Sequence, residues 1–390
     1  MISVEEAKRL LMEHVPVLAR DTVALANASG YVAEDVVAPY DHPLFDMSAV
    51  DGYAFAFDAA VKDRKVVAEI PAGEVFSSGL KPGECARIFT GALVPPGADT
   101  VVMQEFVTRT GDRISHTDVR LKPGANVRRK GEQVRSGQVV LRAGQRLSAA
   151  AKGLLASVGV AAVKVVQAPE VSVLITGNEF ATERTLQAGK IFGSNDVMLD
   201  ALIPATGATA EFDHVPDDLA ALAEAIRRGL ERSDAMISTG GASVGDHDLV
   251  SAAVERCGGR IVFHGVAQKP GKPMLFALFG DKPFFGLPGN PRAVMVLFWE
   301  YVLPFLHAMQ GAKDPWLRGD RLPIAQALEM KGDRAGFRAA KVQGGKVTLL
   351  ADEGSHMLRS LIDADALAYF PADTPSLREG DLVEVHFLPR

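Results

Sequence analysis

Apolar residues recur every three or four positions in several stretches of the chain, which is the spacing of helices that bury one side. At the N-terminus, Ser3 and Glu6 form a capping box, and Val4, Ala7 and Leu11 follow this spacing, so we expect a helix there. The same spacing, or a start and stop signal, predicts further helices at residues 148–159, 196–205, 217–232 and 291–309.

Two short runs in the second half of the chain are apolar or uncharged throughout. Residues 171–176 and 235–238 contain no charged side chain, a pattern typical of strands that are buried on both faces. A hairpin is expected where segments 274–279 and 283–287 flank a Gly-Asp turn. Because these strands alternate with predicted helices, residues 169–316 should form an open α/β sheet.

Two other regions are rich in short β-like runs and in turns that contain proline and glycine. Residues 39–137 are predicted to form a small β-rich domain, and residues 317–390 a C-terminal β domain. The segments 1–38 and 138–168 mix helix and strand signals. The predicted fold class is therefore a multidomain chain of α/β and β parts.

Charge and composition restrict the classes of function. The chain has 42 basic and 48 acidic residues and a net charge of −6, so bulk charge would not attract nucleic acid or an anionic membrane. Its two cysteines cannot build a disulfide framework, its start lacks a signal-peptide pattern, and its longest apolar run, 293–299, is far shorter than the ~20 residues of a membrane span. We expect a soluble cytoplasmic protein without nucleic-acid or membrane partners.

Several familiar catalytic patterns are missing from the sequence. There is no Gly-x-Ser-x-Gly nucleophile elbow, no His-x-x-x-His metal spacing, and no Gly-x-Gly-x-x-Gly after a predicted strand. These observations disfavour a serine hydrolase of the elbow type, a helical zinc site and a Rossmann dehydrogenase.

Candidate chemistry lies in the loops that follow the predicted strands, where open α/β sheets bind ligands. The richest loop is 239–248, whose glycines let backbone N–H groups approach an anion and whose serine adds a donor. Because its acidic pair would repel a phosphate, a divalent cation could bridge the two. A helix cap with turn glycines is the alternative. The site residues meant here are Gly240, Gly241, Ser243, Gly245, Asp246 and Asp248.

Other charged clusters also admit two interpretations. Lys269 and Lys272 stand in a Lys-Pro-Gly-Lys-Pro turn that could hold an oxyanion or could be a solvated turn. Asp46 and Asp51 flank Ser48 and could be metal ligands or acid–base groups, or could make Asx-turns. The basic run that starts at Arg128 could bind phosphate or form a solvated hairpin. Asn290 is explained sufficiently as a helix N-cap.

Taken together and in order, the motifs of this chain closely resemble those of the molybdopterin molybdenumtransferase family, which includes the E domain of gephyrin. The resemblance covers essentially the whole chain. It rests on residues 45–54 (Phe-Asp-Met-Ser-Ala-Val-Asp-Gly-Tyr-Ala), 88–92, 101–105, 126–132, 238–245, 269–273, 286–291 and 354–358.

The resemblance implies an elongated four-domain chain: a discontinuous helix-and-strand domain (1–38 and 138–168), an inserted β domain (39–137), an α/β molybdopterin-binding domain (169–316) and a C-terminal β-barrel-like domain (317–390). It implies a homodimer with the active site at the subunit interface, working alongside other molybdenum cofactor biosynthesis proteins. The implied reaction uses Mg²⁺, takes adenylylated molybdopterin and molybdate, releases AMP, and leaves molybdenum on the dithiolene.

The same resemblance assigns roles to residues of this chain. Asp51 matches the catalytic aspartate, and Lys269 matches a functional position of its motif. In agreement with the chemistry of the lysine turn, Lys269 and Lys272 would hold oxyanion charge as further catalytic residues. Asp217 and Asp248 match acidic positions and would hold the metal. Thr90, Arg128, Glu179, Pro288 and Pro291 match functional positions of the family and are expected to bind the cofactor. The loop chemistry described above adds Gly240, Gly241, Ser243, Gly245 and Asn290 to the cofactor-binding set.

The chain departs from the family pattern at several positions. The usual Arg-Gly-Glu-Asp reads Lys-Gly-Glu-Gln, so that Gln133 replaces a carboxylate, and Asn178 and Asp365 replace an aspartate and an asparagine in other motifs. An amide can serve neither as a base nor as a charged metal ligand. Two alternatives to the transferase therefore stay open: a weakened paralogue that binds molybdopterin or the molybdenum cofactor, and a molybdopterin adenylyltransferase.

Overall fold

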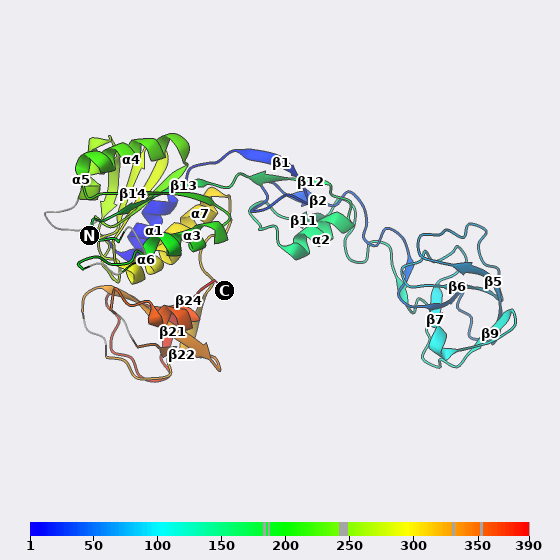
Figure 1. Cartoon of the computed structure of the whole chain (residues 1–390). Coiled ribbons are helices and arrows are strands. Elements are labelled where there is room, and N and C mark those ends of the chain that lie inside the picture. The colour runs from blue at the N-terminus through cyan, green and yellow to red at the C-terminus, as the bar shows by residue number, and fades with distance from the viewer. Residues whose placement is uncertain (182–184, 186–187, 242–248, 330–331, 352–353, 390) are drawn as a thin grey trace.

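The computed structural model describes residues 1–390 except 182–184, 186–187, 242–248, 330–331, 352–353 and 390. The molecule is elongated (Figure 1). An α/β part and a C-terminal β part lie side by side at one end, and a β-rich part lies at the other end. Paired strands near the middle connect the two ends. The multidomain α/β and β organisation expected from the sequence is thus confirmed.

A six-stranded mixed sheet forms the centre of the α/β part. The first four strands in spatial order pair in parallel, and the last two pairings, β19 with β18 and β18 with β16, are antiparallel. All residues of β13 except the first are buried, as the uninterrupted apolar run predicts. The spatial order is β14 (Thr209–Val215), β13 (Glu170–Thr176), β15 (Ala235–Thr239), β19 (Lys282–Leu287), β18 (Leu275–Phe279) and β16 (Arg260–His264).

Helices cover both faces of this sheet and enclose two apolar cores. One core receives side chains from α4 and α5, and the other from α1, α3, α6, α7 and the π-helical turn between α6 and α7. The predicted alternation of strands and helices is therefore confirmed. The bounds are α1 (Val4–Met12), α3 (Asn195–Ala205), α4 (Leu219–Arg232), α5 (Leu249–Arg256), α6 (Pro291–Leu297), the π-helical turn (Phe298–Val302) and α7 (Leu303–Met309).

The N-terminal helix α1 packs into the core of the α/β part, although the sequence analysis grouped residues 1–38 with 138–168. Its buried residues Val4, Ala7 and Leu11 belong to the larger of the two cores. The backbone N–H of Ile2 donates to the carbonyl of Gly265 at 3.2 Å. Apolar side chains spaced along one side of a helix do not specify which sheet they meet. The four domain boundaries stay a proposal.

The middle of the molecule is built from two antiparallel strand pairs and one helix. Its apolar core contains Leu25, Val32, Leu147, Leu155 and Val163. Both strand pairs join an N-terminal segment to a segment after residue 138, so two chain crossings lead to the β-rich part. The elements are β1 (Arg20–Ala24) with β12 (Ala162–Val166), β2 (Val36–Val37) with β11 (Val139–Leu141), and α2 (Ala149–Ser157).

The β-rich part at the far end contains a six-stranded sheet with an apolar cluster on each side. A two-stranded pair beside the sheet joins β3 (Met47–Ser48) to β10 (Val127–Arg128). The sheet has the order β7 (Thr100–Met103), β4 (Gly52–Phe55), β6 (Glu84–Ile88), β5 (Asp63–Ile70), β9 (Arg113–His116) and β8 (Val107–Thr110), with a 3₁₀ turn at Gln104–Phe106.

The C-terminal sheet curls until its two ends meet. Ile324, just after β20, bridges Val347 of β22, and the Ala325 N–H donates to the Val347 carbonyl at 2.7 Å. This closure is the expected barrel-like form. The elements are β17 (Gln268–Lys269), β20 (Gly319–Pro323), β21 (Ala335–Gln343), β22 (Lys346–Leu349), α8 (Arg359–Asp363), β23 (Ala366–Phe370) and β24 (Leu382–Phe387); β17 comes from the α/β part of the chain.

A buried charge cluster ties α1 and the C-terminal sheet to the π-helical turn. The Glu300 carboxylate is 2% exposed and lies 2.7 Å from Lys8 Nζ and 2.8 Å from His386 Nδ1. The second ring nitrogen of His386 lies 3.0 Å from Glu384. Because three separate chain segments supply these charges, the cluster helps to fix the C-terminal sheet against the α/β part.

This cluster predicts that stability falls at alkaline pH. Burial by itself lowers the pKa of His386, but its hydrogen bond to Glu300 and the neighbouring carboxylates outweigh burial and raise that pKa. A raised folded-state pKa adds stability below about 6.5, the unfolded value, and this gain is lost as pH rises through the folded-state pKa. Measured by urea unfolding, the free energy of unfolding should fall less between about pH 6 and about pH 9 in His386→Gln than in the parent. Equal losses would contradict the prediction.

One described helical run has the length and composition of a membrane span. It is Pro291–Met309, with a mean hydropathy of 1.2, and 83% of that stretch is buried inside the protein. Burial on this scale is typical of a core helix of a folded domain.

Candidate functional site

Four parallel strands end at one edge of the α/β sheet, and a candidate site residue follows each of them. Glu179 follows β13, Asp217 follows β14, Gly240 follows β15, and Pro288 follows β19. Because the carboxyl ends of parallel strands face the same way, the fold brings these four loops to one edge, as expected. Three site residues predicted from the sequence, Ser243, Gly245 and Asp248, lie outside the described residues, as does Asp246.

The first two loops are joined by a reciprocal pair of hydrogen bonds. The Asn178 N–H donates to the Asp217 carboxylate, and the Asp217 N–H donates to the Asn178 side-chain oxygen, both at 3.3 Å. Asp217 and Glu179 are exposed. The two carboxylates are therefore open to solvent at the sheet edge, and Asn178, a departure from the family pattern, holds the loops together.

The third loop starts with a glycine that no other residue could replace without strain. Gly240 has a φ of +89°, and a Cβ there would lie 2.3 Å from the Thr176 carbonyl oxygen. A Cβ on Gly289 would lie 3.6 Å from the Gly240 Cα. The loops after β13, β15 and β19 therefore touch one another through backbone, and this leaves backbone groups accessible at the edge.

Three buried polar atoms near this edge have no hydrogen-bond partner within the described part of the chain. They are Thr176 Oγ1, Thr239 Oγ1 and Asn195 Oδ1. The Asn195 amide nitrogen is used, since it donates to the Gly289 carbonyl at 2.9 Å. A buried polar group without a partner is unfavourable. A polar ligand bound at this edge would supply partners for such atoms.

A pocket of about 240 Å³ lies next to the same edge. It brings together the predicted residues Lys269, Lys272, Pro288 and Asn290. None of its described lining residues is acidic, so it suits an oxyanion. The described lining residues are Gln268, Lys269, Pro270, Gly271, Lys272, Pro273, Pro288, Asn290, Ala293, Arg334 and Ser355.

Two of these lining residues, Arg334 and Ser355, come from the C-terminal part and are not among the predicted site residues. Arg334 directly precedes β21, which pairs with β17 of the lysine turn. The Ser355 carbonyl accepts from the backbone N–H of Arg292 in α6 at 3.2 Å. Ser355 stands in one of the quoted motifs, so the sequence held a signal for it. Arg334 follows no recognised motif, and only the pairing of β17 with β21 shows its place.

Asp51 lies in the β-rich part, where Thr90 holds its carboxylate. The Thr90 N–H and hydroxyl each donate to Asp51 Oδ1 at 2.8 Å. These two hydrogen bonds, the backbone one first, lower the pKa of Asp51. The carboxylate is therefore ionised at neutral pH, next to the exposed Thr90.

Near Asp51, structural contacts use most of the charged residues that the sequence singled out. Arg129 Nη1 lies 2.7 Å from the Asp46 carboxylate, and the Lys130 N–H donates to Asp46 at 2.8 Å. Asp46 therefore has a structural role, because it ties its own segment to residues 129 and 130. Arg128 is exposed and, among the described residues, its side chain makes no hydrogen bond or ion pair. Gln133 is exposed as well.

Asp51 and the lysine pocket belong to parts that lie at opposite ends of the elongated molecule. The strands around Asp51 belong to the β-rich part, whereas Lys269 and Lys272 belong to the α/β part (Figure 1). The fold therefore does not bring all the predicted site residues together within one chain. Among the described residues, the structure also has no group of three or more His, Cys, Asp or Glu that could hold a metal ion.

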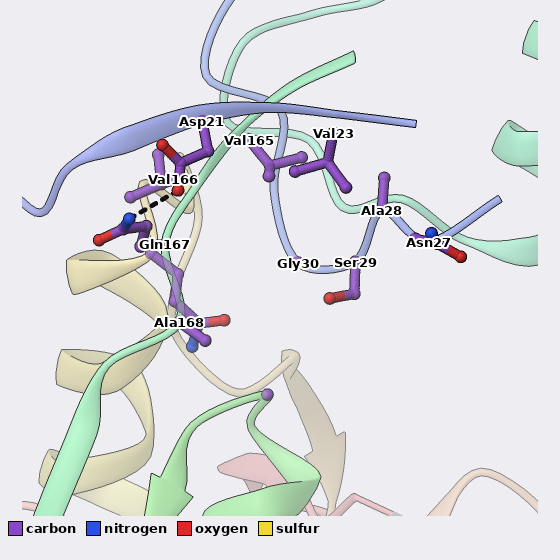
Figure 2. A pocket seen from close by; sticks show the side chains of 12 residues that line it. Asp21, Val23, Asn27, Ala28, Ser29, Gly30, Val165, Val166, Gln167 and Ala168 are labelled. Atoms are coloured by element: carbon purple, nitrogen blue, oxygen red, sulfur yellow. Dashed lines mark hydrogen bonds between the residues drawn. The ribbon is translucent and has the colours of Figure 1, made fainter. Parts of the chain in front are cut away.

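A second pocket, of about 180 Å³, lies where the middle of the molecule meets the α/β part (Figure 2). Asp21 and Gln167 point toward each other there, and the Gln167 amide donates to the Asp21 carboxylate at 2.6 Å. Gly30 and Gly207 also line this pocket. None of its described lining residues is a predicted site residue.

Three family models match successive parts of the chain. The MoeA N-terminal region (domain I and II) matches residues 2–159, the probable molybdopterin binding domain matches 172–308, and the MoeA C-terminal region (domain IV) matches 321–388. Together these matches cover the β-rich part, the α/β part and the C-terminal sheet described above.

Individual relatives match over most of their length. The molybdopterin molybdenumtransferase of Nostoc sp. is 38% identical over 81% of this chain and 76% of its own, and that of Haemophilus influenzae is 30% identical over 99% and 98%. The crystal structure of the molybdopterin biosynthesis MoeA protein from Pyrococcus horikoshii OT3 is 29% identical, covers both chains fully and has a TM-score of 0.83. This chain therefore belongs to the molybdopterin molybdenumtransferase family.

Proposed function

We propose that this protein inserts molybdenum from molybdate into adenylylated molybdopterin and releases AMP. The observation that carries the proposal is the pocket beside the sheet edge, where Lys269, Lys272 and Arg334 meet without an acidic neighbour in the described lining. Three cations around one pocket stabilise the charge of a phosphate or a molybdate. The loops of Gly240 and Gly289 bring backbone N–H groups to the same edge for the pterin phosphate.

The active enzyme is a homodimer in this proposal. Asp51 belongs to the β-rich part, which lies at the opposite end of the molecule from the α/β part that carries the lysine pocket (Figure 1). In the dimer, the β-rich part of one protomer reaches the pocket of its partner and supplies Asp51, Thr90 and Arg128. The ionised Asp51 carboxylate is a weak base, so it serves to orient molybdate or water through hydrogen bonds.

A divalent cation, Mg²⁺, fits the acidic side of the sheet edge. Asp217 and Glu179 are exposed carboxylates in adjacent loops, and Mg²⁺ takes one or two carboxylates together with substrate oxygens. Asp217 would hold it with Asp248, which lies outside the described residues. When bound, the ion would polarise the phosphoanhydride as a Lewis acid. The lysines bind and orient the anionic groups on the other side.

The reaction is tested with adenylylated molybdopterin, Mg²⁺ and molybdate. AMP release that requires molybdate supports the transferase. Consumption of ATP with pyrophosphate release would instead show an adenylyltransferase, and tight pterin binding without either product would show a binding paralogue. The presence of the whole β-rich part with Asp51 and Arg128 favours the first outcome, since an adenylyltransferase would need only the α/β part.

Restoring the missing carboxylate should raise turnover. Gln133 is exposed near Arg128 and Lys130, so an acidic side chain there can serve the site without a folding penalty. We expect Gln133→Asp to release AMP roughly tenfold faster, a barrier lower by ~1.4 kcal/mol. The control Gln133→Asn introduces a side chain of the same length as aspartate but without its charge, and should show no gain in rate. Equal rates for the two variants and the parent would mean that this position has no role in turnover.

The proposed location is the cytoplasm, alongside other proteins of molybdenum cofactor biosynthesis. Both cysteines, Cys85 and Cys257, are free thiols. Free thiols are the normal state in a reducing compartment.

A further inference from the structure

We propose that Gln268 and Tyr301 are positioning residues that hold the lysine turn 269–272 in its binding geometry. The inference rests on the proposed function, because it assigns the turn an anionic substrate. Neither residue carries charge, and Tyr301 does not line the pocket. Gln268 lines it, but its amide nitrogen and oxygen bond to Pro270 and Tyr301, so we infer that both residues act through the backbone between the two lysines.

The Gln268 side chain joins the lysine turn to the core of the α/β part. It is fully buried. Its amide nitrogen donates to the Pro270 carbonyl at 2.7 Å, and its amide oxygen accepts from the Tyr301 hydroxyl. Both ends of the amide are therefore used, and the carbonyl that it holds lies between Lys269 and Lys272.

The turn has few other ways to keep its shape. Pro270 has no N–H, so no backbone hydrogen bond can start from its nitrogen. Gly271 has a φ of +91°, and a Cβ there would lie 2.8 Å from the Leu297 side chain. The Val266 N–H donates to the Lys272 carbonyl at 2.9 Å and so holds the far end of the turn. The Gln268 amide is thus the contact that fixes the middle of the turn.

Tyr301 is a neutral and rigid donor for this purpose. It is fully buried in the π-helical turn, and burial is the first cause that raises the pKa of Tyr301 well above its usual value. A π-helical turn inserts an extra residue into a helix and is frequent at functional sites. Here both Glu300 and Tyr301 are buried. Glu300 pairs with Lys8 and His386, and Tyr301 bonds to Gln268, so the same turn of helix supports the charge cluster and the lysine turn.

The chain offers a matched control for the first of these residues. Gln310 is also a buried glutamine, 1% exposed, whose amide nitrogen donates to the carbonyls of Thr206 and Leu306 at 3.0 Å. It lies away from the lysine pocket. Gln268→Met and Gln310→Met remove the same amide from similar surroundings, so their effects on folding should be comparable.

The experiment measures AMP release while molybdate and adenylylated molybdopterin are varied in turn. For Gln268→Met we expect one KM to rise about tenfold with kcat within about twofold, since a displaced lysine weakens ground-state and transition-state binding alike. A rise confined to molybdate identifies the pocket ligand as molybdate, and one confined to the pterin substrate identifies a phosphate. Gln310→Met should keep both KM values. Tyr301→Phe keeps the bond to Pro270 and should give a smaller rise.

The positioning role is overturned if Gln268→Met keeps both KM values, as Gln310→Met should, or if only its kcat falls; the melting temperatures of the two variants show whether their effects on folding are matched. Failure of the proposed function is seen separately, as a parent protein that releases no AMP. In that case, calorimetric titration with molybdate alone and with AMP alone still compares the two variants. Unchanged affinities for both probes in Gln268→Met would overturn the inference.

Discussion

Replacing Asp51 by asparagine should lower the rate of AMP release by roughly 100-fold or more, the scale of losing a positioned catalytic group, with little change in melting temperature. Asparagine has the same shape, and its side-chain oxygen can still accept the two Thr90 hydrogen bonds of 2.8 Å. Only the negative charge is lost. Because the carboxylate is partly exposed, the folded state depends little on that charge.

The control for this substitution is Asp46→Asn in the same segment. Asp46 accepts hydrogen bonds from Arg129 and from the backbone of Lys130, so its loss should lower stability more than turnover. Activity per folded molecule and thermal unfolding are measured for both variants. If Asp51→Asn unfolds at a much lower temperature while each folded molecule works normally, Asp51 is a structural turn residue and the proposed site is wrong.

The largest effect on stability is expected at Glu300. Replacing it by glutamine leaves Lys8 and His386 partly buried beside a neutral group, and breaking a buried ion pair in this way destabilises proteins by about 3–5 kcal/mol. Burial raises the pKa of Glu300, but His386 and Lys8 outweigh burial and lower it, so the carboxylate is charged in the folded protein. Urea unfolding at neutral pH measures the loss.

Glu13→Gln provides the comparison for Glu300→Gln. Glu13 pairs with Arg9 on the exposed side of α1, and its side chain is 48% exposed. An exposed pair of this kind contributes about 0–1 kcal/mol. A small and equal loss in both variants would show that the Glu300 cluster contributes no more than a surface ion pair.

Features that depend on neighbouring residues could be predicted from the sequence. Ser3 and Ser148 cap α1 and α2 as their patterns indicate, each accepting from a backbone N–H at 3.1 Å. The uncharged run at 171–176 is a buried strand. The loops with Glu179, Asp217 and Gly240 meet at one sheet edge because parallel strands end on the same side.

Features that depend on distant segments could not be predicted in this way. The spacing of Val4, Ala7 and Leu11 shows a buried side of α1 but does not show that the partner is the α/β sheet. Arg334 reaches the pocket only because β17 pairs with β21. The hydroxyl of Tyr301 meets Gln268 across 33 positions of chain. No local pattern contains these pairings.

The two-residue strand β17 has a consequence for how the molecule can be divided. Sequence matches end one region at residue 308 and begin the next at 321, which suggests a place to truncate. A protein shortened there would lose the partner strand of Gln268 and Lys269, and would leave Glu300 beside Lys8 without His386. The last seventy or so residues thus form one side of the lysine pocket, through Arg334 and Ser355. A deletion that begins between residues 308 and 321 would open this pocket as well as remove the C-terminal sheet.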